Sequence, residues 1–262
     1  MRPAYSFDND DPAAEQRHDI LAEMLDPFTF ARLADAGDLT GRRCLEVGAG
    51  GGSVARRLAA LTGPGGRVLA TDLNPRHLPV NQGYAVMRHD LMTDPIPEPP
   101  WDLIHARLVL AHLPRRAEIL HRLAESLAPD GILLVEDWVS AYPDVVLNAP
   151  DAAAAALVER YHRIVVNRLL PANGADPSWG SRTHAAMLAA GLTGVRTEIR
   201  AESWAGGTAG GLLIAVNVAQ VGAGLLAAGL TEAELERLCT LATDPRLVIR
   251  GHLTYSTSGR RR

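Results

Sequence analysis

One glycine-rich segment constrains the fold of this chain more than any other feature. Residues 46–52 read Glu-Val-Gly-Ala-Gly-Gly-Gly; they follow the apolar run Cys44-Leu45 and precede a segment, residues 53–61, with the composition of a helix. Glycines between a strand and a helix allow a tight turn, and they let a ligand approach the backbone without meeting a Cβ atom. A tight turn without a ligand would need the same glycines, so the residues around the segment have to decide between the two interpretations.

Short apolar runs alternate with helical patterns along most of the chain. After the first strand at residues 44–47, further strands are expected at residues 67–71, 86–88, 101–105, 132–136, 195–199 and 247–255. Strands that alternate with helices predict a parallel sheet covered on both faces. The expected fold class is therefore α/β, a Rossmann-like, doubly wound, mostly parallel seven-stranded sheet.

The chain of 262 residues is expected to form a single domain with four parts. Residues 1–40 form a helical N-terminal cap, residues 41–140 the ligand-binding core, and residues 181–262 the C-terminal part of the sheet. Residues 141–180 interrupt the alternation with a helix at 152–170 and a loop, which is the natural place for a lid or substrate-binding insertion.

Acidic residues stand where the expected strands end. Asp72 closes the second strand, 24 positions after Gly48, and Asp90 follows the third strand. A dinucleotide-binding fingerprint would require a third glycine where this chain has Ser53, whereas the pattern acid-x-Gly-x-Gly-x-Gly is complete. A carboxylate at the end of the second strand can accept hydrogen bonds from ribose hydroxyls.

In these residues the chain resembles the class I S-adenosylmethionine-dependent methyltransferases. Glu46, Gly48, Gly50 and Gly52 match the glycine-rich motif of that family. The resemblance implies that Asp72 binds the ribose, that Asp90 and the backbone of Leu91 meet the adenine, and that the backbone after His105 receives the methionine ammonium group. The cofactor-binding residues that it implies are Tyr5, Arg17, Glu46, Gly48, Ala49, Gly50, Gly52, Asp72, Leu73, Asp90, Leu91, Ala106 and Arg107.

Further motifs are similar to a subfamily that methylates small molecules, natural products among them. They are the segment 5–9, Arg17, the run His-x-Arg-Leu-x-Leu-x-His-Leu-Pro at 105–114, and the turn at 129–131. The resemblance implies that Tyr5 closes over the cofactor and that Arg17 pairs with its carboxylate, although a solvated helix arginine is the alternative. Beyond Asp137 the resemblance covers the layout only.

Three residues are candidates for the chemistry at the carboxyl edge of the sheet. His112 is the first, because an imidazole titrates near neutral pH and can accept a proton from the methyl acceptor. Glu136 and Asp137 at the end of the fifth strand are the next two. Packing remains an alternative role for His112, and cofactor binding or loop capping remains one for the two acids.

Composition excludes several other functions. Lysine is absent, so Schiff-base chemistry, a P-loop lysine and the Tyr-x-x-x-Lys pair of short-chain dehydrogenases are all excluded. Two cysteines far apart argue against a disulfide framework or a cysteine metal cluster, and no metal is expected. A net charge of -4 lacks the excess of positive charge that is typical of nucleic-acid-binding proteins.

The expected function is S-adenosylmethionine-dependent methylation of a small molecule, in particular a secondary metabolite. A non-catalytic S-adenosylmethionine-binding protein and a nicotinamide-dependent oxidoreductase are the alternatives. No secretory signal is apparent, and residues 211–230, although long and apolar enough for a membrane span, are expected to form a core helix. A cytoplasmic location without a membrane partner follows, and monomer and homodimer both stay open.

Overall fold

The computed structural model describes residue 10 and residues 12–262, and the chain divides into two compact units. The large-sheet unit comprises residues 25–138, 178–199 and 254–262. The small-sheet unit comprises residues 139–177 and 200–253, together with the described residues up to Met24. Each unit is described by itself below.

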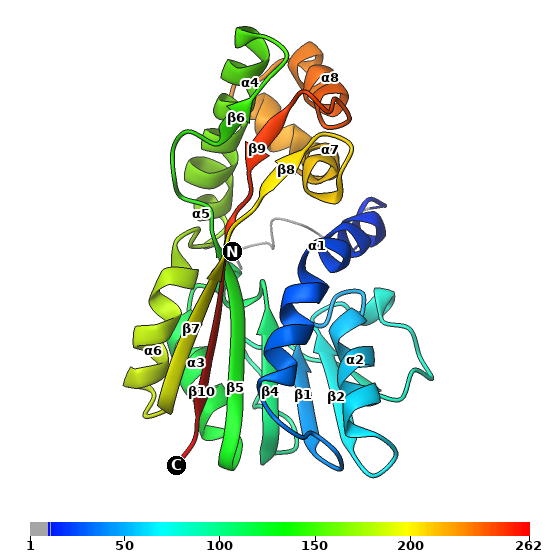
Figure 1. The fold of residues 1–262 in the computed structure, drawn as a ribbon, viewed down its shortest axis with the longest axis vertical. Helices are drawn as coiled ribbons and strands as arrows, with labels where there is room; N and C mark the ends of the chain where they lie inside the picture. Colours follow the sequence, from blue (N-terminus) through cyan, green and yellow to red (C-terminus); the bar gives the residue numbers. More distant parts are fainter. Residues whose placement is uncertain (1–9, 11) are drawn as a thin grey trace. The chain divides into compact units, whose positions relative to one another are not determined.

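A seven-stranded sheet forms the large-sheet unit, in the order β3-β2-β1-β4-β5-β10-β7 (Figure 1). Its strands are β1 (Arg43–Val47), β2 (Arg67–Asp72), β3 (Ala85–Arg88), β4 (Trp101–Arg107), β5 (Leu127–Val139), β7 (Thr193–Arg200) and β10 (Leu253–Arg260). The pairs β2–β3, β1–β2, β1–β4 and β4–β5 are parallel. The predicted Rossmann-like, mostly parallel seven-stranded sheet is thus confirmed, and its order reverses between β1 and β4, where such sheets bind ligands.

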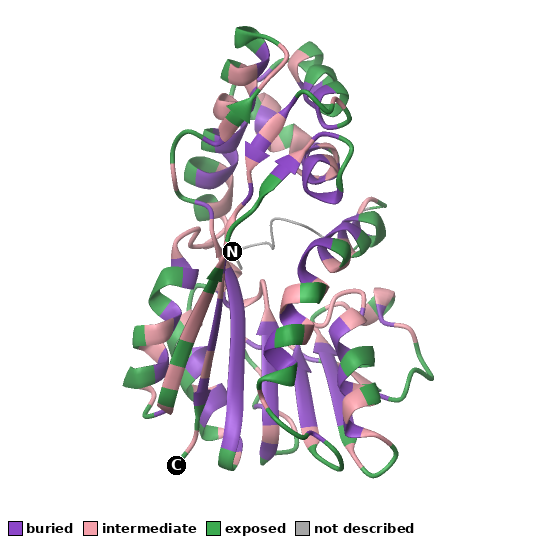
Figure 2. Ribbon diagram, in the orientation of Figure 1, coloured by how far each residue is buried: buried purple, intermediate pink, exposed green. Residues whose placement is uncertain are grey.

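Helices cover both faces of this sheet. On one face, Leu33 of α1 (Ala14–Ala34) and Leu58 of α2 (Ser53–Thr62) pack with Cys44 and Leu103 of the sheet. On the other face, α3 (Arg116–Glu125) and α6 (Thr183–Ala189) pack on the side chains that β1, β4 and β5 direct to that face. The central strands are therefore buried on both sides, which Figure 2 shows as purple ribbons, and this burial explains why their sequences read as continuous apolar runs.

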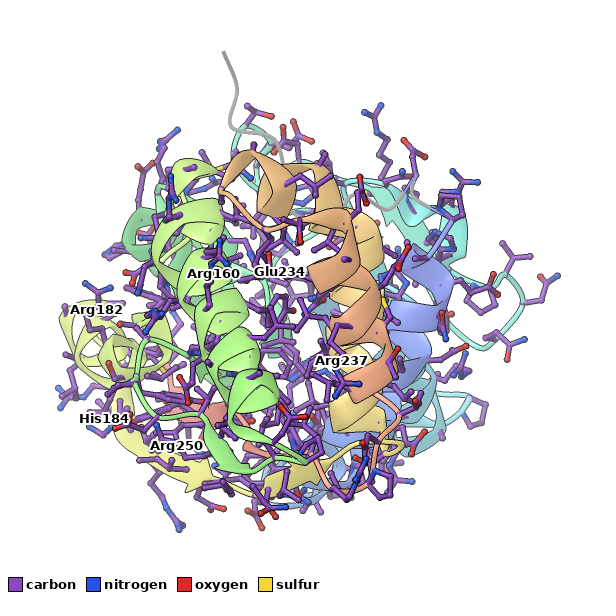
Figure 3. The ribbon with its side chains drawn as sticks, turned by 90° about the horizontal axis from the view of Figure 1, so that it is seen from above. Arg160, Arg182, His184, Glu234, Arg237 and Arg250 are labelled. Carbon is purple, nitrogen blue, oxygen red and sulfur yellow. The ribbon has the colours of Figure 1, made fainter. Side chains whose placement is uncertain are left out.

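The small-sheet unit has a three-stranded sheet of its own, in the order β6-β9-β8 with antiparallel pairs. Its elements are β6 (Val146–Asn148), α4 (Ala152–Ile164), α5 (Leu170–Ala172), β8 (Ser203–Ala205), α7 (Ala209–Ala227), α8 (Glu232–Leu241) and β9 (Val248–Arg250). Figure 3 shows α4 and α8 side by side, with Arg160 of α4 directed at Glu234 of α8 and their charged atoms 2.8 Å apart.

The structure differs from the sequence-based expectation after residue 199. Residues 200–253 do not continue the large sheet but belong with residues 139–177 in the small-sheet unit. The single closing strand expected at 247–255 is two strands, β9 and β10, separated at Gly251. The two strands have different partners, since β9 pairs with β6 and β8 whereas β10 lies between β5 and β7. Gly251 between them lies against Trp204 of β8, whose ring a Cβ atom would overlap.

The long apolar segment forms α7, which begins after the N-cap residue Thr208. By length and composition alone it could cross a membrane, since its mean hydropathy is 1.7, and 44% of that window is buried within the protein. Its buried side includes Leu213, Ile214 and Val218. Length and apolarity are shared by core helices and membrane spans, so they do not distinguish the two.

Candidate active site

The glycine-rich loop lies between β1 and α2, at the carboxyl edge of the large sheet. Gly48, Gly50 and Gly52 have φ angles of 65°, 54° and 77°, a left-handed backbone that favours glycine at each position. A Cβ atom at Gly48 would overlap Cγ2 of Val109, and one at Gly52 would lie 2.5 Å from the hydroxyl of Tyr84. Both the backbone angles and the space therefore require glycine, and the loop presents bare backbone at the sheet edge.

Asp72, the last residue of β2, is directed at this loop. Its Oδ2 accepts the amide hydrogen of Gly50 at 3.0 Å, and its Oδ1 accepts that of Asn74 at 2.9 Å. Burial raises the pKa of Asp72, against the opposing effect of these two amides. The structure thus brings the predicted ribose-binding carboxylate into direct contact with the predicted glycine loop.

The residues predicted to meet an adenine ring follow β3. Oδ1 of Asp90 accepts the amide hydrogen of Met92 at 2.9 Å, and the amide of Asp90 donates to Asp94 at 2.9 Å. Leu91 is buried in the core, whereas Leu73, after β2, is 52% exposed. Since β3 pairs with β2 and Asp72 is in register with Arg88, all of these residues lie at the same edge of the sheet.

Beneath the glycine loop, a buried histidine lies between two glutamates. Nδ1 of His105 in β4 is 2.7 Å from Oε2 of Glu46 in β1, and Nε2 is 3.4 Å from Oε2 of Glu136 in β5. None of the three side chains exposes more than 3% of its surface. Thr29 of α1 donates a further hydrogen bond to Oε2 of Glu136 at 2.5 Å.

Arg107 at the end of β4 is engaged on the same side. Its Nη1 is 2.9 Å from Asp26 and 2.9 Å from Thr29, both on α1, and its Nη2 donates to Ser53, the first residue of α2, at 3.3 Å. Ala106 before it is buried. The side chain of Arg107 is thus engaged within the protein, and the assignment of Ala106 and Arg107 to the cofactor stays a prediction.

The three candidates for the chemistry have different surroundings. His112 is half-buried in the 3-10 turn η2 (Leu110–His112), which packs against η4 (Trp179–Arg182). Burial acts to raise the pKa of Glu136, but the hydrogen bond and the charge of His105 overcome it and lower that pKa. Asp137, the next residue, is 1% exposed, and burial raises its pKa well above the ordinary value, against the opposing effects of a backbone hydrogen bond from Ala111 and the charge of Arg116.

Two predicted cofactor residues are not brought to the loop within the large-sheet unit. Arg17 is buried in the small-sheet part of α1, where its Nε donates to Oδ1 of Asn217 in α7 at 3.3 Å. Tyr5 lies outside the described residues. Both assignments stay predictions.

Sequence analysis did not assign roles to His105, Thr29, Asp26 and Ser53. The only available signal was a polar residue inside an apolar strand, His105, two positions before Arg107. Its partner follows from the register of β1 with β4, in which Glu46 is paired with His105. For metals, the described part of the chain contains no group of three or more His, Cys, Asp or Glu side chains that could hold an ion.

A protein-family comparison agrees with this geometry. Residues 14–176 match the model of a methyltransferase domain. Among curated proteins, methyltransferase str2 of Strobilurus tenacellus is 41% identical over 106 residues, which is 38% of either chain. Trans-aconitate 2-methyltransferase of Methylobacterium nodulans is 37% identical over 123 residues, or 42% of this chain and 46% of that one. The chain thus spans less than half the length of these relatives.

Solved structures share the fold at low sequence identity. YcgJ of Bacillus subtilis superposes with a TM-score of 0.54 at 14% identity, covering 90% of this chain and 99% of that one. Phosphoethanolamine N-methyltransferase 2 of Haemonchus contortus, in complex with S-adenosylhomocysteine, gives 0.51 at 14% identity, covering 94% of this chain and 52% of that one. Since the family model matches well over half of the sequence, the chain belongs to the methyltransferase domain family.

Proposed function

We propose that this protein transfers the methyl group of S-adenosylmethionine to a small-molecule acceptor. The observation that carries the proposal is the contact between Asp72 and the amide of Gly50. It joins a carboxylate suited to ribose hydroxyls with a loop of bare backbone, at the point where the strand order of the sheet reverses.

The residues at this edge fit S-adenosylmethionine. A Cβ atom is excluded at Gly48 and Gly52, and the φ angle of 54° at Gly50 favours glycine there as well. Asp72 would hold the ribose, Asp90 and Leu91 the adenine, and the backbone of Ala106 and Arg107 the methionine ammonium group. When bound, S-adenosylmethionine supplies a methyl group on a sulfonium, so the protein mainly has to align the acceptor.

The three catalytic candidates divide by their environment. Glu136 is held by His105 and Thr29, and its lowered pKa makes it a weak base. The raised pKa of Asp137 keeps this carboxyl group protonated at a higher pH than is usual for aspartate. His112 lies half-buried in the turn after β4. A carboxyl group that holds its proton cannot accept another, so we propose His112 ahead of Glu136 and Asp137 as the group that accepts a proton from an acceptor that has to lose one.

For the acceptor, the proposal extends to secondary metabolites and related small molecules. The names of the relatives suggest two chemical classes: trans-aconitate is a carboxylic acid, and the C-methyltransferase UbiE of Pseudomonas aeruginosa, 24% identical over 142 residues, acts in ubiquinone and menaquinone biosynthesis. We further propose a cytoplasmic protein with α7 as a core helix and with neither nucleic acid nor a membrane as partner. Gel filtration without detergent would test whether α7 is a core helix, because a protein with an exposed membrane span would aggregate. The elution volume would distinguish a monomer from a homodimer.

Isothermal titration calorimetry with S-adenosylhomocysteine and, separately, with NAD tests the cofactor. We expect binding of the first and none of the second; binding of NAD alone would favour the oxidoreductase alternative. A methyl-transfer assay by mass spectrometry against polycarboxylic acids and quinols tests the acceptor class. A protein that binds S-adenosylhomocysteine and methylates nothing in a wide panel would favour the non-catalytic alternative.

A further inference from the structure

His105 lies in the interior of the large-sheet unit, where it contacts the acid that begins the glycine-rich motif. β1 and β4 run parallel with Glu46 in register with His105, so both side chains leave the sheet on the same face. In β5, Glu136 lies two positions beyond Leu134, the residue in register with His105, and its side chain therefore leaves the sheet on that face too. One fully buried imidazole thus meets carboxylates from the two neighbouring strands.

We propose that His105 is the positioning residue of the cofactor site: it binds Glu46 and Glu136 at once and so fixes the carboxylate at the start of the glycine-rich loop. His105 acts through Glu46 and is not itself a catalytic residue. The inference rests on the proposed function of this edge as a cofactor site.

Hydrogen-bond geometry argues that the ring carries both protons. A neutral imidazole has one N–H donor and one lone pair, so one of its nitrogens would direct a lone pair at a carboxylate oxygen. An imidazolium donates from Nδ1 to Glu46 and from Nε2 to Glu136, and both acids can then stay ionised. Oε2 of Glu136 already accepts from Thr29, which favours its ionised form.

Electrostatics supports the same protonation state. Burial acts to lower the pKa of His105, but the charge of Glu46 and the hydrogen bonds of both glutamates overcome it and raise that pKa to about 9. The other charged groups that face this cluster are Arg107, which acts on Glu136, and Asp26, which pairs with Arg107 at 2.9 Å. The cluster therefore holds an imidazolium at neutral pH.

The same network reaches both ends of the glycine-rich loop. Glu46 precedes the loop, and Ser53 follows it as the first residue of α2. From Glu46 the contacts run through His105, Glu136 and Thr29 to Arg107, and Arg107 donates to Ser53 at 3.3 Å. A loop with left-handed glycines has little side-chain packing of its own, so anchoring both of its ends fixes the backbone that a cofactor would meet.

The test compares His105→Gln, Glu136→Gln and His121→Gln, an exposed histidine of α3 that serves as the matched control. Calorimetry measures the affinity for S-adenosylhomocysteine between pH 7 and 10, and ¹⁵N NMR of the imidazole groups reads the protonation of the wild-type ring, assigned by its loss in His105→Gln. The ligand has an amino group that titrates in every variant, so only differences between variants count.

We expect the wild-type ring to be protonated on both nitrogens at pH 7.5 and to lose a proton near pH 9. His105→Gln should bind S-adenosylhomocysteine about tenfold to a hundredfold more weakly at pH 7.5, since a charge-assisted hydrogen bond to Glu46 is lost, while His121→Gln binds as the wild type does. The extra alkaline loss of affinity should be absent from His105→Gln. In Glu136→Gln it should move to lower pH, because one of the two charges that hold the proton is gone.

A folded His105→Gln that binds as tightly as the wild type would overturn the proposal, as would a neutral ring at pH 7.5. If His105→Gln does not fold, the wild-type NMR titration and the shift in Glu136→Gln decide, and an alkaline step that Glu136→Gln leaves in place would count against His105. A wild-type protein that binds no S-adenosylhomocysteine would refute the proposed function, whereas normal wild-type binding with an unaffected His105→Gln refutes only the positioning role.

Discussion

Two neighbouring carboxyl groups of β5 show how strongly the surroundings of a single residue decide its charge. Glu136 and Asp137 leave the strand on opposite faces. Glu136 meets His105 and Thr29, and its pKa is lowered, whereas burial raises the pKa of Asp137 well above the ordinary value in spite of a backbone hydrogen bond from Ala111. A carboxyl group whose pKa is raised by burial costs stability at neutral pH, and such a cost is typical of a functional site.

Asp137→Asn should therefore stabilise the protein at neutral pH. In the wild type the unfolded state releases the proton of Asp137 above pH 3.8 while the folded state keeps it, so this residue lowers stability as pH rises from that value through its raised folded-state pKa. We expect a gain of about 1 kcal/mol at pH 7, or about 2–4 °C in Tm, which vanishes below pH 4. Thermal melts of Asp137→Asn and of the exposed control Asp130→Asn measure this; an equal or lower Tm for Asp137→Asn would contradict the prediction.

Substitutions of Asp72 should weaken binding of the cofactor in a graded way. Asp72→Asn keeps the shape of the side chain but loses one acceptor, and Asp72→Ala loses both. We expect the affinity for S-adenosylhomocysteine to fall about tenfold in the first and up to about a hundredfold in the second, since ribose hydroxyls are left without partners. Calorimetry with Asp130→Asn as control checks the order, and unchanged binding by Asp72→Ala would place the ribose elsewhere.

At the scale of elements, the β1–α2 loop is determined by what its neighbours exclude. Gly48 lies against Val109 with a φ angle of 65°, so alanine there meets both a steric overlap and a strained backbone. Gly65, in the turn before β2, has ordinary van der Waals contact only. The two glycines of one unit therefore form a matched pair for the same substitution.

Gly48→Ala should bind no detectable S-adenosylhomocysteine and should have a lower Tm, because the loop can admit the side chain of the new alanine only by moving. Gly65→Ala should leave both unchanged. Circular dichroism and calorimetry on the two variants measure fold and binding separately. Normal binding by a folded Gly48→Ala would mean that the loop is not the cofactor contact.

Local pattern predicted the elements of the large sheet and failed for the small one. β1, β2 and β4 are buried on both faces, so each reads as an apolar run; a glycine follows β1 and an acid ends β2. β6, β8 and β9 are three residues long, too short for a pattern, and Ile249 pairs with both Val146 and Trp204 across more than forty positions of sequence. The role of His105 was hidden for the same reason, since the register that brings it to Glu46 is non-local.

At the scale of the whole molecule, the two units carry buried histidines of opposite character. In the large-sheet unit His105 has a pKa raised to about 9. In the small-sheet unit burial lowers the pKa of His252 to about 3, and burial also lowers that of His162, whose ring lies 5.9 Å from that of His252. The Tyr142 hydroxyl donates to the carbonyl oxygen of Gly251 at 2.8 Å and lies 3.1 Å from Nδ1 of His252.

These histidines predict that the two units respond to pH in opposite directions. The proton on His105 stabilises the large-sheet unit fully below pH 6.5, and this contribution is lost as pH rises through about 9. Neutral His252 stabilises the small-sheet unit above pH 6.5, and this contribution is lost as pH falls toward about 3, because the unfolded state then binds a proton that the folded state does not bind.

Hydrogen exchange with mass spectrometry, corrected for the intrinsic rate, should show residues 200–253 losing protection at pH 5 and residues 43–138 losing it at pH 9.5. His252→Asn should abolish the first loss and His105→Gln the second. Uniform loss of protection in both units at either pH would mean that they unfold as one and that neither histidine sets the stability of its own unit.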